Sequence, residues 1–168
     1  MVASAVLVGM AEIHVAKGAA TFTCLGLGSC IGLVALDPTA NVAGSAHIML
    51  PEAFAEKTND KPGKFADTAI PELLKMLEGL GAEKSRLRWA MAGGAQVFKF
   101  GGGANSRLDV GARNSAAVDR LAKQYGLRMV ARDVGGSLGR TVTFTAETGI
   151  VLVRTVSQGE VELCRLRG

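Results

Sequence analysis

The sequence predicts an α/β (α+β) protein with many short strands and two main helices. Its 168 residues suit one domain, and we expect residues 1–168 to form a single domain because no repeat, linker or low-complexity segment divides them. Hydrophobic residues make up 48% and charged residues 20%, a composition typical of globular proteins. Short apolar runs separated by Gly, Pro, Asp or Asn indicate strands, whereas only two segments carry apolar residues at helical spacing.

Strands dominate the first half of the chain. The turn DPTAN at 37–41 separates two of them, and the polar segment 52–63 is predicted to be a loop. The predicted strands are 2–8, 12–16, 21–25, 31–36 and 42–50.

A helix is predicted near 65–80, where apolar residues recur at helical spacing and Gly81 can cap the end. Proline is common at the first position of a helix and unfavourable inside one, so the main helix can begin at Pro71. A second helix is predicted near 112–125 and is closed by Gly126.

The remaining segments of the second half are strands and glycine-rich turns. GGAQVFKFGGGANS, after the strand at 86–92, is predicted to be a glycine-rich loop, and DVGGSLGR a glycine turn. The last three strands can form a meander. The predicted strands are 86–92, 127–134, 141–145, 150–156 and 161–166.

Charge and cysteine content exclude several classes of protein. The net charge of +4 is mild, and no basic helix carries interleaved stacking aromatics, so we expect no nucleic-acid partner; an acidic protein partner fits better. The apolar N-terminus is too short to span a membrane, and we expect no membrane insertion. Three cysteines without a CxxC pair argue against a disulfide framework or a metal site. We therefore expect a cytoplasmic protein that needs no cofactor.

Cys30 is the main candidate for chemistry. Gly28-Ser29-Cys30-Ile31-Gly32 has the G-x-nucleophile-x-G spacing of a nucleophile elbow, and small neighbours leave room for a substrate at the sulfur. That elbow requires a helix after the nucleophile, whereas the apolar run IGLVALDP predicts a strand. The α/β-hydrolase interpretation is therefore excluded, and a buried cysteine at the start of a strand is the simpler alternative to a nucleophile.

A thiol nucleophile needs a base or a cation beside it, because the thiolate is the reactive form. The chain offers two histidines, His14 in a polar stretch and His47 at the end of an apolar strand. Strand alternation places Ser45 and His47 on one face. The glycine clusters do not match a phosphate-binding loop, because no GK[ST] follows and Gly26, Gly28 and Gly32 are spaced GxGxxxG.

The ordered motifs of the chain resemble the chemoreceptor glutamine deamidase family, CheD. They are LGLGSCIGLVALDP (25–38), GSAHIMLPE (44–52), KFADTAIPELLKML (64–77), MAGGAQVF (91–98), GARNSAAV (111–118) and ARDVGGSLGRTVTFTAETGIVLV (131–153). The resemblance implies a β-sandwich-like core with flanking helices, similar in fold to the cytotoxic necrotizing factor toxins.

The resemblance also implies a reaction and its partners. The family hydrolyses glutamine side-chain amides on methyl-accepting chemotaxis receptors to glutamate and ammonia, and some members hydrolyse glutamyl methyl esters. Family members bind CheC, a phosphatase of the response regulator CheY. A CheC-binding adaptor without catalysis and a general cysteine hydrolase of small esters are the alternatives.

Carried onto this sequence, the resemblance makes Cys30 the nucleophile and His47 the base. Backbone N–H groups around Gly28, Ser29 and Cys30 would hold the oxyanion. The family's third residue is a threonine six positions before the cysteine, a place that Cys24 takes here. Thr23 is a tentative replacement, but both it and Thr21 belong to the opposite face of a regular strand unless a bulge re-aims Thr23. Otherwise Cys24 itself fills the orienting role.

Overall fold

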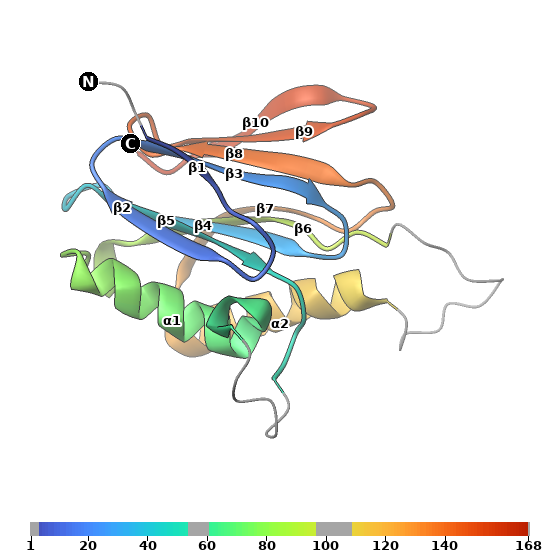
Figure 1. Cartoon of the computed structure of the whole chain (residues 1–168), viewed down its shortest axis with the longest axis horizontal. Coiled ribbons are helices and arrows are strands. Elements are labelled where there is room, and N and C mark those ends of the chain that lie inside the picture. The colour runs from blue at the N-terminus through green and yellow to red at the C-terminus, as the bar shows by residue number, and fades with distance from the viewer. Residues whose placement is uncertain (1–3, 54–60, 97–108, 168) are drawn as a thin grey trace, which may run out of the picture.

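Two stacked β-sheets and two helices make up three layers (Figure 1). The computed structural model describes residues 4–53, 61–96 and 109–167. The helices pack on the outer face of one sheet, and the other sheet covers the opposite face. The predicted α+β class with two main helices is therefore confirmed.

The first sheet has the strand order β1-β3-β8-β9-β10. Strand β1 runs parallel to β3, and the last three strands form the predicted antiparallel meander. Burial alternates along β3, so one of its faces packs into the core and the other is partly exposed. The bounds are β1 (Ser4–Leu7), β3 (Ala20–Leu27), β8 (Arg140–Thr145), β9 (Ile150–Thr155) and β10 (Gly159–Arg165).

The second sheet has the strand order β2-β5-β4-β6-β7. Every residue of β4 and β5 is buried, because the helices cover one face of this sheet and the first sheet covers the other. This burial explains why both strands consist mostly of apolar and small residues, with Asp37 and His47 as the exceptions. The bounds are β2 (Ile13–Lys17), β5 (Val42–Ile48), β4 (Ile31–Asp37), β6 (Arg88–Gly93) and β7 (Arg128–Val134).

The two helices are α1 (Ala66–Gly79) and α2 (Val110–Tyr125). Helix α1 does not begin at Pro71, as the sequence allowed, but passes through it. A proline there removes one backbone hydrogen bond, whereas starting at Ala66 lets the first turn join the buried apolar face. Helix α2 ends at Gly126 as predicted, in the left-handed conformation with φ 69°.

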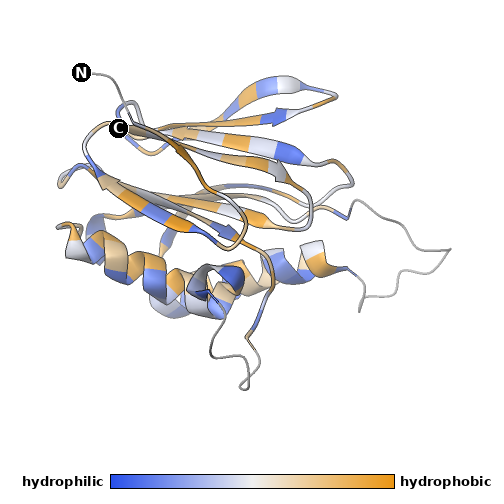
Figure 2. Cartoon of the chain, viewed as in Figure 1, coloured by the Kyte–Doolittle hydropathy of each residue, from blue (hydrophilic) through white to orange (hydrophobic). Residues whose placement is uncertain are grey.

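Hydrophobic and hydrophilic residues alternate around both helices, as expected for helices that cover one side of a sheet (Figure 2). Two short 3₁₀ helices, η1 (Pro62–Lys64) and η2 (Lys84–Arg86), flank α1. Most of the predicted loop at 52–63 and of the glycine-rich loop after β6 lies outside the described residues. Within the described ranges, no helix has the length and apolar character needed to cross a membrane.

Two apolar cores result from this layering. One lies between the helices and the second sheet around Trp89, Leu33 and Leu73. The other lies between the sheets around Phe22, Phe144 and Val34, and Cys30 packs against its edge. The candidate nucleophile therefore sits where the space between the two sheets ends.

Candidate active site

Residues Gly28, Ser29 and Cys30 form the connection by which the chain leaves the first sheet and enters the second. Strand β3 precedes this connection and β4 follows it directly, so the predicted strand after Cys30 is confirmed. A change of sheet within three residues requires a sharp bend, which the glycine-rich sequence permits.

Three consecutive backbone carbonyls of this connection are held by hydrogen bonds from distant parts of the chain. The bonds run from Ala95 N to Gly28 O (2.8 Å), from Asn114 Nδ2 to Ser29 O (2.8 Å) and from Gly94 N to Cys30 O (2.9 Å). Within the described chain, the N–H groups of Ser29 and Cys30 donate to no other backbone group. The connection is thus fixed through its carbonyls, and the N–H groups of Ser29 and Cys30 remain available to donate hydrogen bonds to another molecule.

His47 lies on the strand next to Cys30 and on the same face. It is the cross-strand partner of Gly32, which stands two residues after Cys30. Residues two apart on a strand share a face, so Cys30 and His47 are diagonal neighbours, a relation that brings Cα atoms to roughly 7–8 Å. Gly32 has no side chain of its own beside the imidazole.

His47 is 4% exposed, and a single backbone group selects the tautomer of its ring. Its Nδ1 lies 3.0 Å from the carbonyl oxygen of Val8. A carbonyl oxygen can only accept, so Nδ1 carries the proton and Nε2 of the neutral ring is the free base. This is the tautomer that a general base for a thiol requires.

The loop that follows β1 holds His47 from both sides of its backbone. Ala11 N donates to His47 O at 2.9 Å, and His47 N donates to Glu12 O at 3.1 Å. The Glu12 carboxylate in turn accepts from Gly9 N (2.9 Å) and pairs with His14 Nε2 (3.1 Å). The hydrogen bond with His14 lowers the pKa of Glu12.

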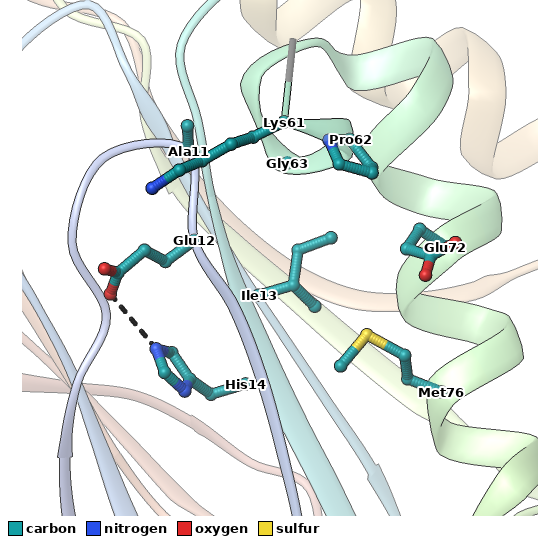
Figure 3. A pocket seen from close by; sticks show the side chains of 9 residues that line it. All are labelled: Ala11, Glu12, Ile13, His14, Lys61, Pro62, Gly63, Glu72 and Met76. Atoms are coloured by element: carbon teal, nitrogen blue, oxygen red, sulfur yellow. Dashed lines mark hydrogen bonds and ion pairs between the residues drawn. The ribbon is translucent and has the colours of Figure 1, made fainter. Parts of the chain in front are cut away.

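His14 does not lie beside Cys30. It belongs to edge strand β2, which β5 separates from β4. Figure 3 shows it turned toward Glu12, beside an open pocket of about 310 Å³ that Lys61, Glu72 and Met76 also line. Of the two candidate histidines, the structure brings only His47 beside Cys30.

The structure places Cys24 and Thr23 on opposite faces of β3. Cys24 is 1% exposed and faces the second sheet, where its Sγ lies 3.6 Å from Ser45 Oγ. Thr21 and Thr23 are cross-strand partners of Thr145 and Thr143 on the partly exposed face. The irregularity in β3 falls after Cys24 and does not re-aim Thr23, so the tentative assignment of Thr23 to the site does not fit this geometry.

Burial raises the pKa of the Cys30 thiol above its ordinary value. At neutral pH the thiol is therefore protonated until a base removes its proton. Burial also raises the pKa of Cys24, to about 11, so that this second thiol is a poor nucleophile. The arrangement suits base-assisted attack by Cys30 and no other described cysteine.

The sequence alone does not indicate two groups of the site, the Val8 carbonyl and the Asn114 side chain. The Val8 carbonyl is a backbone atom, and nothing in the sequence marks it as a partner of His47. Asn114 is fully buried on α2, and its only sequence signal is an amide side chain on the apolar face of a helix. Such a residue needs hydrogen-bond partners, but the sequence does not say which ones.

Comparisons with known proteins identify the family to which the chain belongs. A family model described as "CheD chemotactic sensory transduction" matches residues 49–155. The "Chemoreceptor glutamine deamidase CheD" of Halalkalibacterium halodurans is 45% identical over 159 residues, covering 94% of this chain and 98% of the relative. The protein of the same name from Thermotoga maritima is 41% identical over 154 residues, covering 92% and 94%.

A "Probable chemoreceptor glutamine deamidase CheD" of Desulfitobacterium hafniense is 46% identical over 153 residues, covering 91% of this chain and 94% of the relative. A solved structure of Neisseria meningitidis protein NMB0706, of the DUF152 family, superposes with a TM-score of 0.47 at 8% identity, over 80% of this chain and 63% of that one. The sequence similarity extends over nearly the full length of the curated relatives, and the chain belongs to the CheD family.

Proposed function

We propose that this protein deamidates glutamine side chains of methyl-accepting chemotaxis receptors, producing glutamate and ammonia through a thioester on Cys30. Family membership supports the substrate, because the curated relatives are named chemoreceptor glutamine deamidases. The observation that carries the chemistry is the hydrogen bond from His47 Nδ1 to the Val8 carbonyl, which leaves Nε2 as the ring nitrogen that can accept a proton, on the strand beside Cys30.

In the first half of the reaction, Nε2 of His47 removes the thiol proton and Sγ of Cys30 attacks the amide carbon of the glutamine. The amide oxygen takes the negative charge of the tetrahedral intermediate. The carbon–nitrogen bond then breaks, and His47 returns its proton to the departing nitrogen, which leaves as ammonia. A thioester joins Sγ to the former amide carbon.

In the second half, His47 removes a proton from water and the hydroxide attacks the thioester. The carbon–sulfur bond breaks, Cys30 regains its proton, and the side chain leaves as glutamate. The N–H groups of Ser29 and Cys30 stabilise the oxyanion in both halves. Their freedom from other backbone partners supports this role, and Gly28 gives the substrate room to approach.

The same groups would hydrolyse a glutamyl methyl ester, since only the leaving group changes, from ammonia to methanol. We also propose CheC as a protein partner, because the family resemblance implies it, and cytoplasmic receptor domains as the location of the substrate. The mildly positive net charge of +4 is compatible with acidic protein surfaces.

A CheC-binding adaptor with weak catalysis is the second candidate. One observation favours it: Cys24 occupies the position of the family's threonine and contacts Ser45. Against it stands the complete arrangement of Cys30, His47 and the Val8 carbonyl, none of which depends on a side chain at position 24.

Ammonia release from a cognate receptor cytoplasmic fragment separates the two candidates. We expect release by the wild type, none by Cys30→Ala, and a loss of about 100-fold or more for His47→Ala. Cys164→Ala is the matched control, because Cys164 is a half-buried cysteine of the distant strand β10 and should leave the rate unchanged. Binding of CheC without ammonia release by the wild type would favour the adaptor instead.

A further inference from the structure

We propose that Asn114 is a positioning residue, whose side-chain amide sets Cys30 in register with His47. Asn114 lies in α2 on the face that packs against the second sheet, and it is 0% exposed. Its neighbours on that face, one and two turns further along, are Ala117, Val118 and Leu121. Burying a polar amide among apolar residues lowers the stability of the fold unless the amide forms hydrogen bonds there.

The Asn114 amide joins the two strand ends that carry the reacting residues. Its Nδ2 donates to Ser29 O at 2.8 Å and to Met49 O at 2.9 Å. Ser29 directly precedes Cys30, and Met49 comes two residues after His47. Both protons of one nitrogen are thus used to hold the start of β4 and the end of β5 at a fixed separation.

The bond to Ser29 also sets the direction of the proposed oxyanion donor, the N–H of Cys30. The carbonyl of Ser29 and the N–H of Cys30 belong to the same planar, trans peptide group and point in opposite directions. Drawing the Ser29 carbonyl toward Asn114 therefore directs the Cys30 N–H away from α2. Asn114 in this way orients the donor that the proposed reaction uses, without touching the substrate itself.

The donor function of Asn114 accounts for the residue type. Its Oδ1 is buried and has no hydrogen-bond partner within the described chain. The opposite orientation of the amide would place Oδ1 against two carbonyl oxygens, so the two acceptors fix which way the amide lies. Aspartate and leucine have a similar size but no such donors.

The test is a double-mutant cycle on the reactivity of Cys30. The rate of Cys30 alkylation by iodoacetamide at pH 7 is followed by peptide mapping in the wild type, Asn114→Leu, His47→Ala and the double variant. We expect Asn114→Leu to slow alkylation about tenfold when His47 is present and not at all when it is absent, because the amide acts through the Cys30–His47 pair.

If Asn114→Leu slows Cys30 alkylation equally with and without the His47→Ala substitution, or slows it in neither case, the proposal is overturned. Asn114→Ser, which keeps one donor, should fall between the wild type and Asn114→Leu, and it replaces Asn114→Leu in the cycle if that variant does not fold. Ser115→Ala is the matched control, because within the described ranges the hydroxyl of Ser115 donates only inside α2, to Gly111 O at 3.1 Å.

The inference rests on the proposed deamidase function, and a second measurement keeps the two apart. In deamidation of a receptor fragment, we expect Asn114→Leu to lower kcat about 100-fold with KM unchanged, the effect of a misplacement of about 1 Å. Full kcat in this variant would refute the role of Asn114 and leave the function intact. A wild type that releases no ammonia refutes the function, while the alkylation cycle still decides the role of Asn114.

Discussion

His47 is oriented by the backbone of Val8, and this changes the importance of position 24. Cys24 lies between the sheets and contacts Ser45, and no described hydrogen bond joins it to the imidazole. The threonine expected from the family resemblance is absent, but Nδ1 of His47 still has the Val8 carbonyl as its hydrogen-bond partner. Cys24 serves mainly as a small core residue against Gly32, where an added Cβ would lie 3.4 Å from its Sγ.

Substitution of Cys24 should consequently have a small effect on catalysis. We expect Cys24→Ala and Cys24→Thr to change kcat by less than about tenfold, or 1.4 kcal/mol, because Nδ1 keeps its carbonyl partner. Initial rates of ammonia release from a receptor fragment check this, with Cys30→Ala as the inactive reference. A loss in Cys24→Ala as deep as that in Cys30→Ala would assign the orienting role to residue 24.

Among the secondary-structure elements, the end of β6 positions Cys30. Gly93 has φ +118°, and a Cβ there would overlap the carbonyl oxygen of Cys30. The next residue, Gly94, donates to that same carbonyl at 2.9 Å. Only a glycine lets β6 approach the connection between the sheets this closely.

Gly93→Ala should therefore displace Cys30 and lower kcat by about 100-fold or more. Gly79→Ala is the control, because an added Cβ at this helical position meets nothing within 4 Å. The control should keep full activity and raise stability by about 0.5–1 kcal/mol. Receptor deamidation and thermal unfolding of both variants provide the measurement, and an active Gly93→Ala would contradict the account of this connection.

Sequence patterns predicted elements better than they predicted contacts. Strand alternation correctly placed Ser45 and His47 on one face, and Gly126 ended α2 as expected. Strand β3 extends beyond the predicted end because its pairing resumes at Leu27 after an irregularity at Gly26. Residue type, spacing and resemblance made Cys30 and His47 candidates, whereas the contacts of Val8 and Asn114 exist only in the folded chain.

For the molecule as a whole, a partly buried ion pair secures the end of β4 that lies away from Cys30. Asp37 is fully buried, and its carboxylate lies 3.0 Å from Arg86 Nη2. Burial alone would raise the pKa of Asp37, but the Arg86 guanidinium and three backbone N–H groups outweigh it and lower the pKa to about 2. These backbone donors belong to Thr39, Ala40 and Glu83.

This pair should make stability depend on acid. The folded pKa of Asp37 lies below its ordinary 3.8, so the stabilisation is full above about pH 4 and is lost as the pH falls toward 2. We expect Asp37→Asn to cost about 2 kcal/mol at pH 7, or roughly 4–8 °C in Tm. In thermal unfolding scans, the difference in Tm between Asp37→Asn and the wild type should narrow between pH 4 and pH 2. A difference in Tm that stays constant with pH would contradict this.

The proposed conversion of receptor glutamine to glutamate requires Cys30, activated by His47. Peptide mapping by mass spectrometry of a cognate receptor cytoplasmic fragment, after incubation with the wild type or Cys30→Ala, tests it most directly. The account predicts glutamate at specific glutamine positions with the wild type and unchanged glutamine with Cys30→Ala. Equal conversion by both proteins, or no conversion by the wild type, would contradict it.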